Sequence, residues 1–150
     1  MDVIQGPDCA FCKIVRGQTP HYSVLEDQVS LGFLDHRPLF PGHTLLISKA
    51  HYETLVDLPV DLLTALFSNS QLLAHAMERG LGAEGSFVAI NNRVSQSIPH
   101  FHIHIVPRRK KDGLKGFFWP RQRYKDEAAI LEVQTALRTA IADFRSRAIK

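Results

Sequence analysis

Three histidines alternate with apolar residues in a segment that reads PHFHIHIVP over residues 99–107. In a β-strand every second side chain shares a face, so His100, His102 and His104 are predicted to line one face, with neighbours about 6–7 Å apart. Each imidazole has two nitrogens that need partners, so three rings in a row are poor packing material. A neutral imidazole is also a usable nucleophile near pH 7. The pattern favours a reactive face over its alternatives, a metal-binding strand or an exposed polar face.

The two cysteines, Cys9 and Cys12, form a C-x-x-C pair near the N-terminus. Two cysteines are too few for a disulfide scaffold, so the pair favours metal binding or redox chemistry. One alternative is that both are reduced and packed as small hydrophobic side chains. Another is a thioredoxin-like redox pair, although the order of the predicted elements does not fit that fold.

A basic segment follows the histidines. Residues 108–125 hold eight lysines and arginines against one aspartate, in a chain whose formal net charge is +3. The rest of the chain is therefore mildly acidic, and the segment predicts either an anionic ligand or a solvated loop. Its aromatic side chains are available to stack on a base, or to cover the core or a partner subunit, and these are Phe117, Phe118 and Trp119.

The elements that must position these residues follow from the hydrophobic pattern. A short helical hook is predicted over residues 9–16, a long helix that starts near Leu58 and is stopped by Gly80 and Gly82, and a C-terminal helix over about 126–147. Strands are predicted over residues 22–26, 29–35, 43–48, 86–91 and 100–106, the last being the catalytic strand. This order predicts an α+β fold, in which an antiparallel five-stranded sheet has one long helix inserted before its last two strands.

Length and composition indicate one globular domain over residues 1–150. The chain has 150 residues, of which 45% are hydrophobic and 22% charged, as in average soluble proteins. No apolar run approaches the roughly 18–20 residues that a membrane span needs. The N-terminus lacks an apolar block of signal-peptide length, so a cytoplasmic protein without a membrane partner is expected.

The sequence resembles the histidine-triad (HIT) superfamily of nucleotide hydrolases and transferases. Three pieces carry the resemblance in the expected order, namely CAFCKIVRG, FLDHRPLFPGHTLLISKAH and QSIPHFHIHIVPR. The resemblance implies a HIT-like fold in which His102 is the nucleophile. His102 would attack the α-phosphorus of an adenine nucleotide derivative and form a nucleotidyl-histidine, which water or another acceptor then resolves.

The resemblance also implies roles for the residues around the nucleophile. The backbone carbonyl of His100 would hold the tautomer of His102, while His104 would contact the phosphate or the bridging oxygen. Gln96 matches a glutamine that bonds near the scissile bridge, and Ser97 beside it is a further candidate donor.

Three more positions match residues of the family's nucleotide pocket. His43 matches a histidine beside the phosphate, and Asp35 matches the residue that binds the ribose hydroxyls. Asn91 matches a strand-end asparagine. The loop over residues 91–96 is about two residues shorter than usual in this family and lacks its glycines, so Asn91 and Asn92 are alternatives for that position.

A zinc site is predicted from a Cys₂His₂ set of ligands, which suits a closed tetrahedral structural Zn²⁺. Zinc-containing, bacterial-type members of the superfamily have C-x-x-C at this place and use a histidine after the third strand together with the first triad histidine. The matching residues here are Cys9, Cys12, His51 and His100. The other histidines belong to no constellation and are expected at the surface or in local caps, and these are His21, His36 and His75.

Several leaving groups are compatible with this chemistry. The Pro-Arg pair after the triad resembles the dinucleoside polyphosphate hydrolases of the family. A nucleoside phosphoramidase, an adenylyl-sulfate-type hydrolase and a non-catalytic nucleotide-binding module are the alternatives. Docking on nucleic acid through the basic segment is disfavoured because no further basic domain accompanies it. The family resemblance implies a homodimer, and no organic cofactor is expected.

Overall fold

The computed structural model of the protein describes residues 6, 8–114 and 122–148. These residues form two compact units, one up to Asp112 and one from Gly113 onward. The expectation of a single domain over the whole chain stays a prediction. The aromatic residues 117–119 of the basic segment lie outside the described residues, as do its Lys115 and Arg121.

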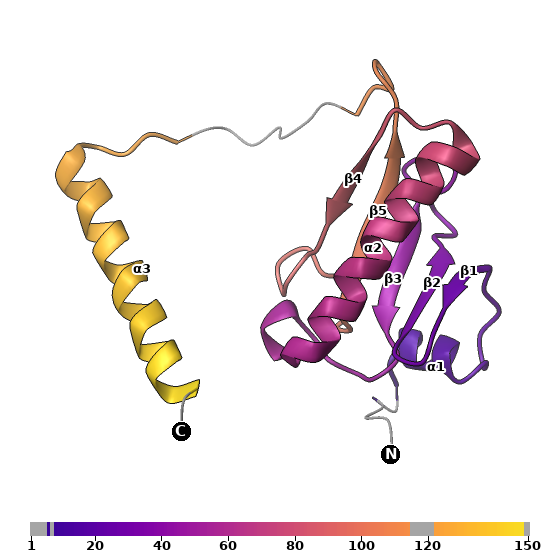
Figure 1. Cartoon of the computed structure of the whole chain (residues 1–150), viewed down its shortest axis with the longest axis horizontal. Helices are drawn as coiled ribbons and strands as arrows, with labels where there is room; N and C mark the ends of the chain where they lie inside the picture. The colour runs from indigo at the N-terminus through magenta and orange to yellow at the C-terminus, as the bar shows by residue number, and fades with distance from the viewer. Residues whose placement is uncertain (1–5, 7, 115–121, 149–150) are drawn as a thin grey trace. The chain divides into compact units, whose positions relative to one another are not determined.

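The first unit is built on a five-stranded sheet, which confirms the fold predicted from the sequence (Figure 1). Its strands lie in the order β1-β2-β3-β5-β4, and every neighbouring pair is antiparallel. The strands are β1 Ser23–Glu26, β2 Ser30–Leu34, β3 Thr44–Ser48, β4 Gly85–Ala89 and β5 His102–Arg108.

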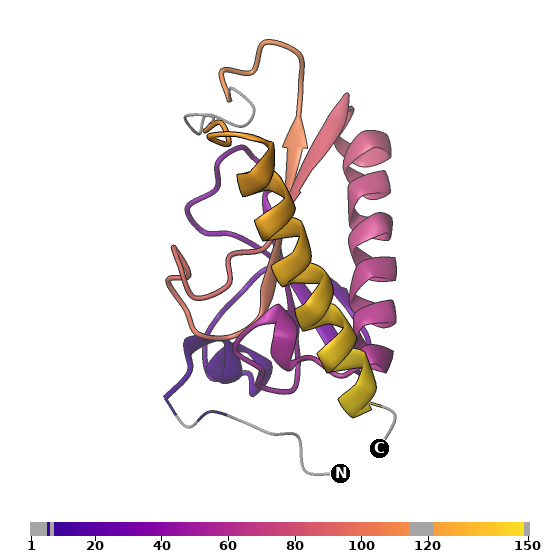
Figure 2. The same cartoon turned by 90° about the vertical axis from the view of Figure 1, so that its left-hand side faces the viewer.

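Two α-helices and a short 3-10 helix complete this unit, and they are α1 Ala10–Val15, η1 Leu55–Asp57 and α2 Val60–Leu81. Helix α2 is the predicted insertion between β3 and β4. It follows Pro59 and ends at Gly82, whose φ of 63° is the left-handed conformation that favours glycine at a helix end. Figure 2 shows α2 along one face of the sheet, with α1 on the other side.

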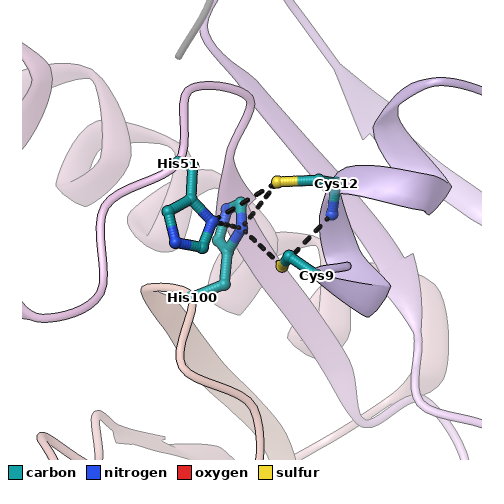
Figure 3. A group of neighbouring side chains, drawn as sticks. All are labelled: Cys9, Cys12, His51 and His100. Atoms are coloured by element: carbon teal, nitrogen blue, oxygen red, sulfur yellow. Dashed lines mark hydrogen bonds between the residues drawn. The ribbon is translucent and has the colours of Figure 1, made fainter. Parts of the chain in front are cut away.

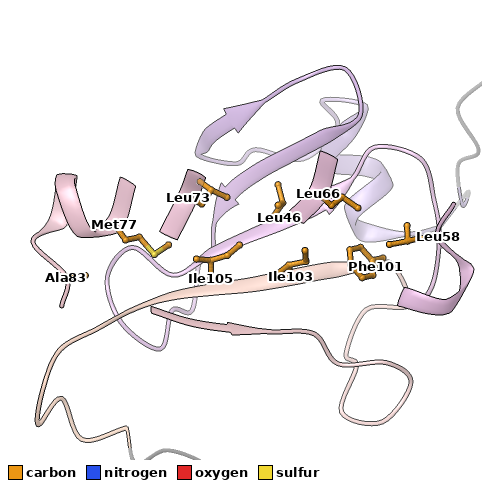
Figure 4. Packing of buried hydrophobic residues seen from close by; sticks show 9 residues of the cluster. All are labelled: Leu46, Leu58, Leu66, Leu73, Met77, Ala83, Phe101, Ile103 and Ile105. Atoms are coloured by element: carbon orange, nitrogen blue, oxygen red, sulfur yellow. The ribbon is translucent and has the colours of Figure 1, made fainter. Parts of the chain in front are cut away.

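The alternation of β5 divides its side chains between these two faces. Ile103 and Ile105 are buried against α2, in the main hydrophobic cluster with Leu46 and Leu66 (Figure 4). A second cluster lies on the opposite face and contains Phe11 of α1 together with Leu31, Phe33, Leu45 and Ile47. Because β3 pairs Leu45 with His104 and Ile47 with His102, these two histidines lie on that opposite face.

Strand β5 begins two residues later than the predicted catalytic strand, so His100 lies in the loop before it. The backbone N–H of His100 donates to the carbonyl of Ile98, at 2.8 Å, and the N–H of Phe101 donates to the carbonyl of Tyr52, at 2.6 Å. Hydrogen bonds within and between loops therefore replace the hydrogen bonds between strands at this point. The His100 ring is positioned by the loop and not by the alternation of a strand.

Part of the basic segment is used inside the first unit. Arg108 forms an ion pair with Asp112, with Nε and Oδ2 2.6 Å apart. The guanidinium of Arg109 donates to the carbonyls of Leu81 and Gly82 at the end of α2. A cation at this position satisfies helix carbonyls that have no partner within the helix. At least two of the basic residues thus have a structural role.

The second unit contains helix α3, Glu127–Ala148, close to the predicted C-terminal helix. Its apolar residues recur along one face, and no second helix or strand occurs in the described part of this unit. Across the described residues of the whole chain, no helix is long and apolar enough to span a membrane.

Candidate active site and metal centre

A cavity of about 800 Å³ lies on the sheet face that carries His102 and His104. This volume is within the range of small-molecule sites. Asp35, just after β2, and Ser97 also line it, so four residues proposed from the sequence meet there. Its apolar wall comes from residues that the sequence analysis did not single out, and these are Phe11, Ile14, Phe33, Leu45 and Ile98.

Other residues of the lining could not be recognised from spacing. His21 and His36, which the sequence placed at the surface or in caps, line the cavity with Lys13 and Arg37. The sequence could have indicated these residues only through their position, because they lie within the two upstream family motifs or shortly after the first one. The cavity therefore has an apolar wall together with several charged or titratable side chains.

His102 is buried and held by a main-chain bond. Its Nδ1 lies 2.7 Å from the carbonyl oxygen of His100, which can only accept a hydrogen bond. Nδ1 therefore carries the proton and Nε2 keeps its lone pair. Burial lowers the pKa of His102 below the usual histidine value, against the opposing effects of this bond and of Asp35. The ring of Phe11 packs edge-on against it, with centroids 5.2 Å apart.

His104 and His43 are bonded to each other. His43 Nε2 lies 3.0 Å from His104 Nδ1, and the backbone N–H of Leu39 donates to His43 Nδ1 at 3.1 Å. Burial, reinforced by the neighbouring His102 and His43, lowers the pKa of His104 to about 4. His43 is itself buried and is not among the described residues that line the cavity. It lies behind His104, not beside the ligand space.

The carboxylate of Asp35 is held at the edge of the cavity. Its Oδ1 accepts the backbone N–H of Arg37 at 2.9 Å, and its Oδ2 lies 3.8 Å from Nδ1 of His43. Asp35, His43 and His104 are close enough to hold a metal ion, but the facing nitrogens of the two histidines are joined by the hydrogen bond just described. The arrangement suits a carboxylate that accepts hydrogen bonds from a ligand.

Gln96 is directed elsewhere. Its Oε1 accepts the backbone N–H of Arg93 at 2.7 Å, and its Nε2 donates to the carbonyl of Glu53 at 2.6 Å. Neither Gln96 nor Asn91 is among the described residues that line the cavity. In this conformation Gln96 fastens its own loop to the segment before η1.

The rest of that loop is also tied down. The Oδ1 of Asn92 accepts the backbone N–H of Leu55 at 2.8 Å. Arg93 and Ser95 have φ values of 64° and 60°, which is unusual for residues other than glycine. The loop lacks the expected glycines, and non-glycine residues adopt the left-handed conformation in it at a cost in strain.

The four predicted zinc ligands meet in one cluster (Figure 3). Cys9 Sγ and Cys12 Sγ lie 3.3 and 3.6 Å from His100 Nδ1, and Cys12 Sγ lies 3.4 Å from His51 Nδ1. The two Nδ1 atoms are 3.2 Å apart. In a tetrahedral zinc site, ligand bonds of normal length imply separations of about 3.3–3.8 Å between ligand atoms. The cluster therefore fits Zn²⁺ in both composition and spacing.

The orientation of the His100 ring also suits a metal ligand. Its Nε2 lies 2.7 Å from the carbonyl oxygen of Ser48, so Nε2 carries the proton and the lone pair of Nδ1 faces the thiols. On the other side of the cluster, Cys9 is the N-cap of α1 and accepts the backbone N–H of Cys12. Burial raises the pKa of the Cys12 thiol. The cluster joins the N-terminal helix to the residue that holds the tautomer of His102.

The chain also matches a known protein family. Residues 16–111, well over half of the chain, match the family described as HIT domain. Among curated proteins, the adenylylsulfatase HINT3 of Arabidopsis thaliana is 40% identical over 109 residues, which are 71% of this chain and 55% of that protein. The adenosine 5'-monophosphoramidase HNT1 of Saccharomyces cerevisiae is 34% identical over 116 residues, or 76% and 71% of the two chains.

Solved structures show the same fold. A HIT family protein from Bacillus anthracis has a TM-score of 0.80 and 28% identity, and the match covers 91% of this chain and 99% of that one. A zinc-bound histidine triad family protein from Mycobacterium smegmatis is 37% identical, with a TM-score of 0.69 and coverage of 93% and 97%. Sequence and structure therefore lead to one family.

Proposed function

The chain belongs to the HIT-domain family, and from this premise we propose that it is a nucleotide hydrolase or transferase that acts through a nucleotidyl-His102 intermediate. The observation that carries the proposal is the state of His102. Its Nδ1–H is bonded to the carbonyl of His100, the ring lines the cavity, and no residue that the structure describes bonds to its Nε2. A neutral imidazole fixed in this way is ready to attack phosphorus.

Other residues that line the cavity would contact the base and the ribose of an adenine nucleotide. The base would pack against the apolar wall formed by Phe11, Phe33 and Ile98. The Asp35 carboxylate would accept the ribose hydroxyls, which places the α-phosphate over the two cavity histidines. His102 Nε2 would bond to phosphorus as the bond to the leaving group breaks, and water or another acceptor would then release the nucleotide.

For the leaving group we propose the phosphate chain of a dinucleoside polyphosphate. Adenylyl sulfate and nucleoside phosphoramidates are the alternatives, and they are the substrate types that the names of the Arabidopsis and yeast relatives state. All three substrate types produce the same nucleotidyl-histidine, so one mechanism serves each of them. Lys13 and Arg37 at the cavity would attract the anionic chain.

We propose that Cys9, Cys12, His51 and His100 bind one structural Zn²⁺. The support is their spacing, the orientation of His100 and the zinc-bound relative from Mycobacterium smegmatis. When bound, zinc would neutralise the thiolates and fasten α1 to the loop before β5. The cysteines must be reduced to bind it, which suits a cytoplasmic protein.

A homodimer is the assembly that we propose. Helix α3 carries an apolar stripe that no other element of its unit covers in the described residues. A second copy of the chain would bury such a stripe and remove it from water. Light scattering after gel filtration measures the mass of the assembly.

Turnover of a substrate panel tests the proposed function. The panel comprises diadenosine tri- and tetraphosphate, an adenosine phosphoramidate and adenylyl sulfate. We expect at least one substrate to turn over, and His102→Ala to lower kcat by several orders of magnitude. His75→Ala is the matched control, because His75 is exposed on α2 and outside the cavity. If the wild-type protein binds AMP and turns over no substrate, it is a nucleotide-binding module and the proposed mechanism is wrong.

A further inference from the structure

The hydrogen bonds of His43 determine which of its nitrogens carries the proton. The backbone N–H of Leu39 lies 3.1 Å from Nδ1 of His43, and a backbone N–H can only donate. Nδ1 is therefore the acceptor and has no proton of its own. The Asp35 carboxylate is 3.8 Å from the same nitrogen, too far to compete for it. In its neutral form His43 must carry its proton on Nε2.

This assignment extends to His104. Nε2 of His43 lies 3.0 Å from Nδ1 of His104, and because it is the donor, His104 Nδ1 must accept. A neutral His104 then carries its proton on Nε2. Among the residues that the structure describes, no group bonds to that Nε2, and the ring lines the cavity. One backbone N–H thus sets the tautomers of two rings in series.

Both rings are neutral at pH 7. Burial lowers the pKa of His43, and the charge of Asp35 opposes this only in part. Burial also lowers the pKa of His104 to about 4. The titratable groups that act on His104 are His102 on its own strand, His43 before β3 and Asp35 after β2, and only the last raises its pKa.

We propose that His43 is a positioning residue that locks His104 in the Nε2–H tautomer, so that His104 presents a neutral hydrogen-bond donor to the substrate's phosphate group or bridging atom. The inference rests on the proposed function and changes one role that the sequence implied. His43 does not contact the phosphate, and it acts through His104.

The two cavity histidines are thereby fixed in opposite tautomers. His102 carries its proton on Nδ1 and directs a lone pair at the ligand, whereas His104 carries its proton on Nε2 and directs an N–H at the ligand. Negative charge develops on the phosphate oxygens and the leaving atom as the bond breaks. A donor that is already oriented stabilises this charge without reorganisation. No proton needs to leave His104 in this role.

The tautomer is measured directly by two-bond ¹H–¹⁵N NMR of the imidazole rings in the wild-type protein. We expect His104 to show a protonated Nε2 and an unprotonated Nδ1 at pH 7. In His43→Leu, which removes the donor, we expect a mixture of tautomers. In His43→Gln, whose amide can restore an N–H toward His104, we expect the wild-type tautomer to recover. A wild-type His104 with its proton on Nδ1 would overturn the inference.

Kinetics tests the consequence. With a substrate that turns over, kcat of His43→Leu should fall in proportion to the fraction of His104 that stays in the Nε2–H tautomer, about twofold for an equal mixture, with a smaller change in KM. His43→Gln should recover part of the loss, and His75→Leu is the control. The loss should be larger for leaving groups of higher pKa, because they depart with more charge to stabilise. An unchanged kcat in a variant with mixed tautomers also overturns the role.

Failure of the proposed function is distinguishable from failure of this inference. If no substrate turns over, the NMR experiment still decides whether the lock exists. AMP affinity then replaces kcat as the readout, because His104 would donate to the phosphate of AMP as well. A loss of AMP affinity in His43→Leu that matches the fraction of His104 outside the Nε2–H tautomer supports the role, and an unchanged affinity rejects it.

Discussion

Two groups of histidines lie around the start of β5, and they differ in what each ring nitrogen faces. In the proposed zinc cluster, Nδ1 of His100 lies within 3.6 Å of both thiols, and Nδ1 of His51 lies 3.4 Å from Cys12 Sγ and 3.2 Å from Nδ1 of His100. In the second group, Nε2 of the buried His43 lies 3.0 Å from Nδ1 of the cavity residue His104, and we infer that it donates to the lone pair there. In the cluster, lone pairs of sulfur and nitrogen converge on a common centre, as a metal ion requires. In the second group, donors and acceptors alternate from the N–H of Leu39 through His43 to His104.

The difference shows that the nitrogen bonded to the main chain determines what the other nitrogen of the same imidazole can do. His100 bonds Ser48 through Nε2, which leaves Nδ1 for a metal. His102 bonds the carbonyl of His100 through Nδ1, which leaves Nε2 for attack. Neighbouring residues of one segment thus serve different chemistry because different main-chain groups hold them. His100 also links the two regions, since its ring belongs to the cluster and its carbonyl accepts from His102, the proposed nucleophile.

Removal of one thiol should have the largest effect on stability. Cys12→Ser is expected to reduce bound zinc from one per chain to none. If zinc is present at 1,000 times its Kd, the lost binding corresponds to about 4 kcal/mol of stability. In a domain of this size, Tm should fall by about 10 °C. Metal analysis and thermal unfolding measure both changes.

Chelated wild-type protein is the control for that variant. It should melt at the temperature of Cys12→Ser, because each lacks the same ion. A Cys12→Ser protein that retains one zinc and the wild-type Tm would show that the cluster is not a metal site.

Loss of His43, which donates to His104, should have a smaller effect on stability than loss of the thiol and should leave the bound zinc in place. His43→Leu leaves the backbone N–H of Leu39 and the Nδ1 of His104 without their partner, and such losses amount to about 1–3 kcal/mol where the groups are shielded from water. Urea unfolding measures the free energy of unfolding, and metal analysis should still give one zinc per chain. Loss of zinc in this variant would mean that the two regions are not independent.

The cavity histidines should also make stability depend on pH. The pKa of His104 is about 4 in the folded protein, against 6.5 in the unfolded chain. Between these values the unfolded state binds more protons, so stability is complete above pH 6.5 and decreases as the pH falls toward 4. Urea unfolding of metal-free protein at several pH values measures this dependence. In His104→Gln the slope should be smaller, and an equal slope would contradict the assignment.

The smallest effect is expected at a residue that belongs to neither group. Arg109 donates to the carbonyls of Leu81 and Gly82 at the end of α2, and its side chain is exposed. Arg109→Ala should lower the free energy of unfolding by about 0.5–1 kcal/mol. Zinc content and turnover should not change. A change in either would show that the metal cluster and the cavity respond to general destabilisation.

The sequence alone predicted the five strands, the three α-helices and their order. Alternation over residues 101–105 separated the apolar side chains of β5 from its histidines, because a strand has two faces wherever it is placed. Helical spacing located α2, and Gly82, one of the two glycines predicted to stop it, ends it because its positive φ favours glycine. The spaced motifs identified the family before any coordinates were known.

Only the tertiary structure decided which atom faces which. The register of β3 pairs Leu45 with His104 and so sets His43 diagonally beside it, a contact across 61 residues that no local pattern contains. The tertiary structure also directs Gln96 toward the carbonyl of Glu53, because the hydrogen bonds of a loop depend on which segments pack beside it. A sequence pattern assigns side chains to faces, whereas the partner of each ring nitrogen depends on strand register and loop packing, which are set by the whole fold.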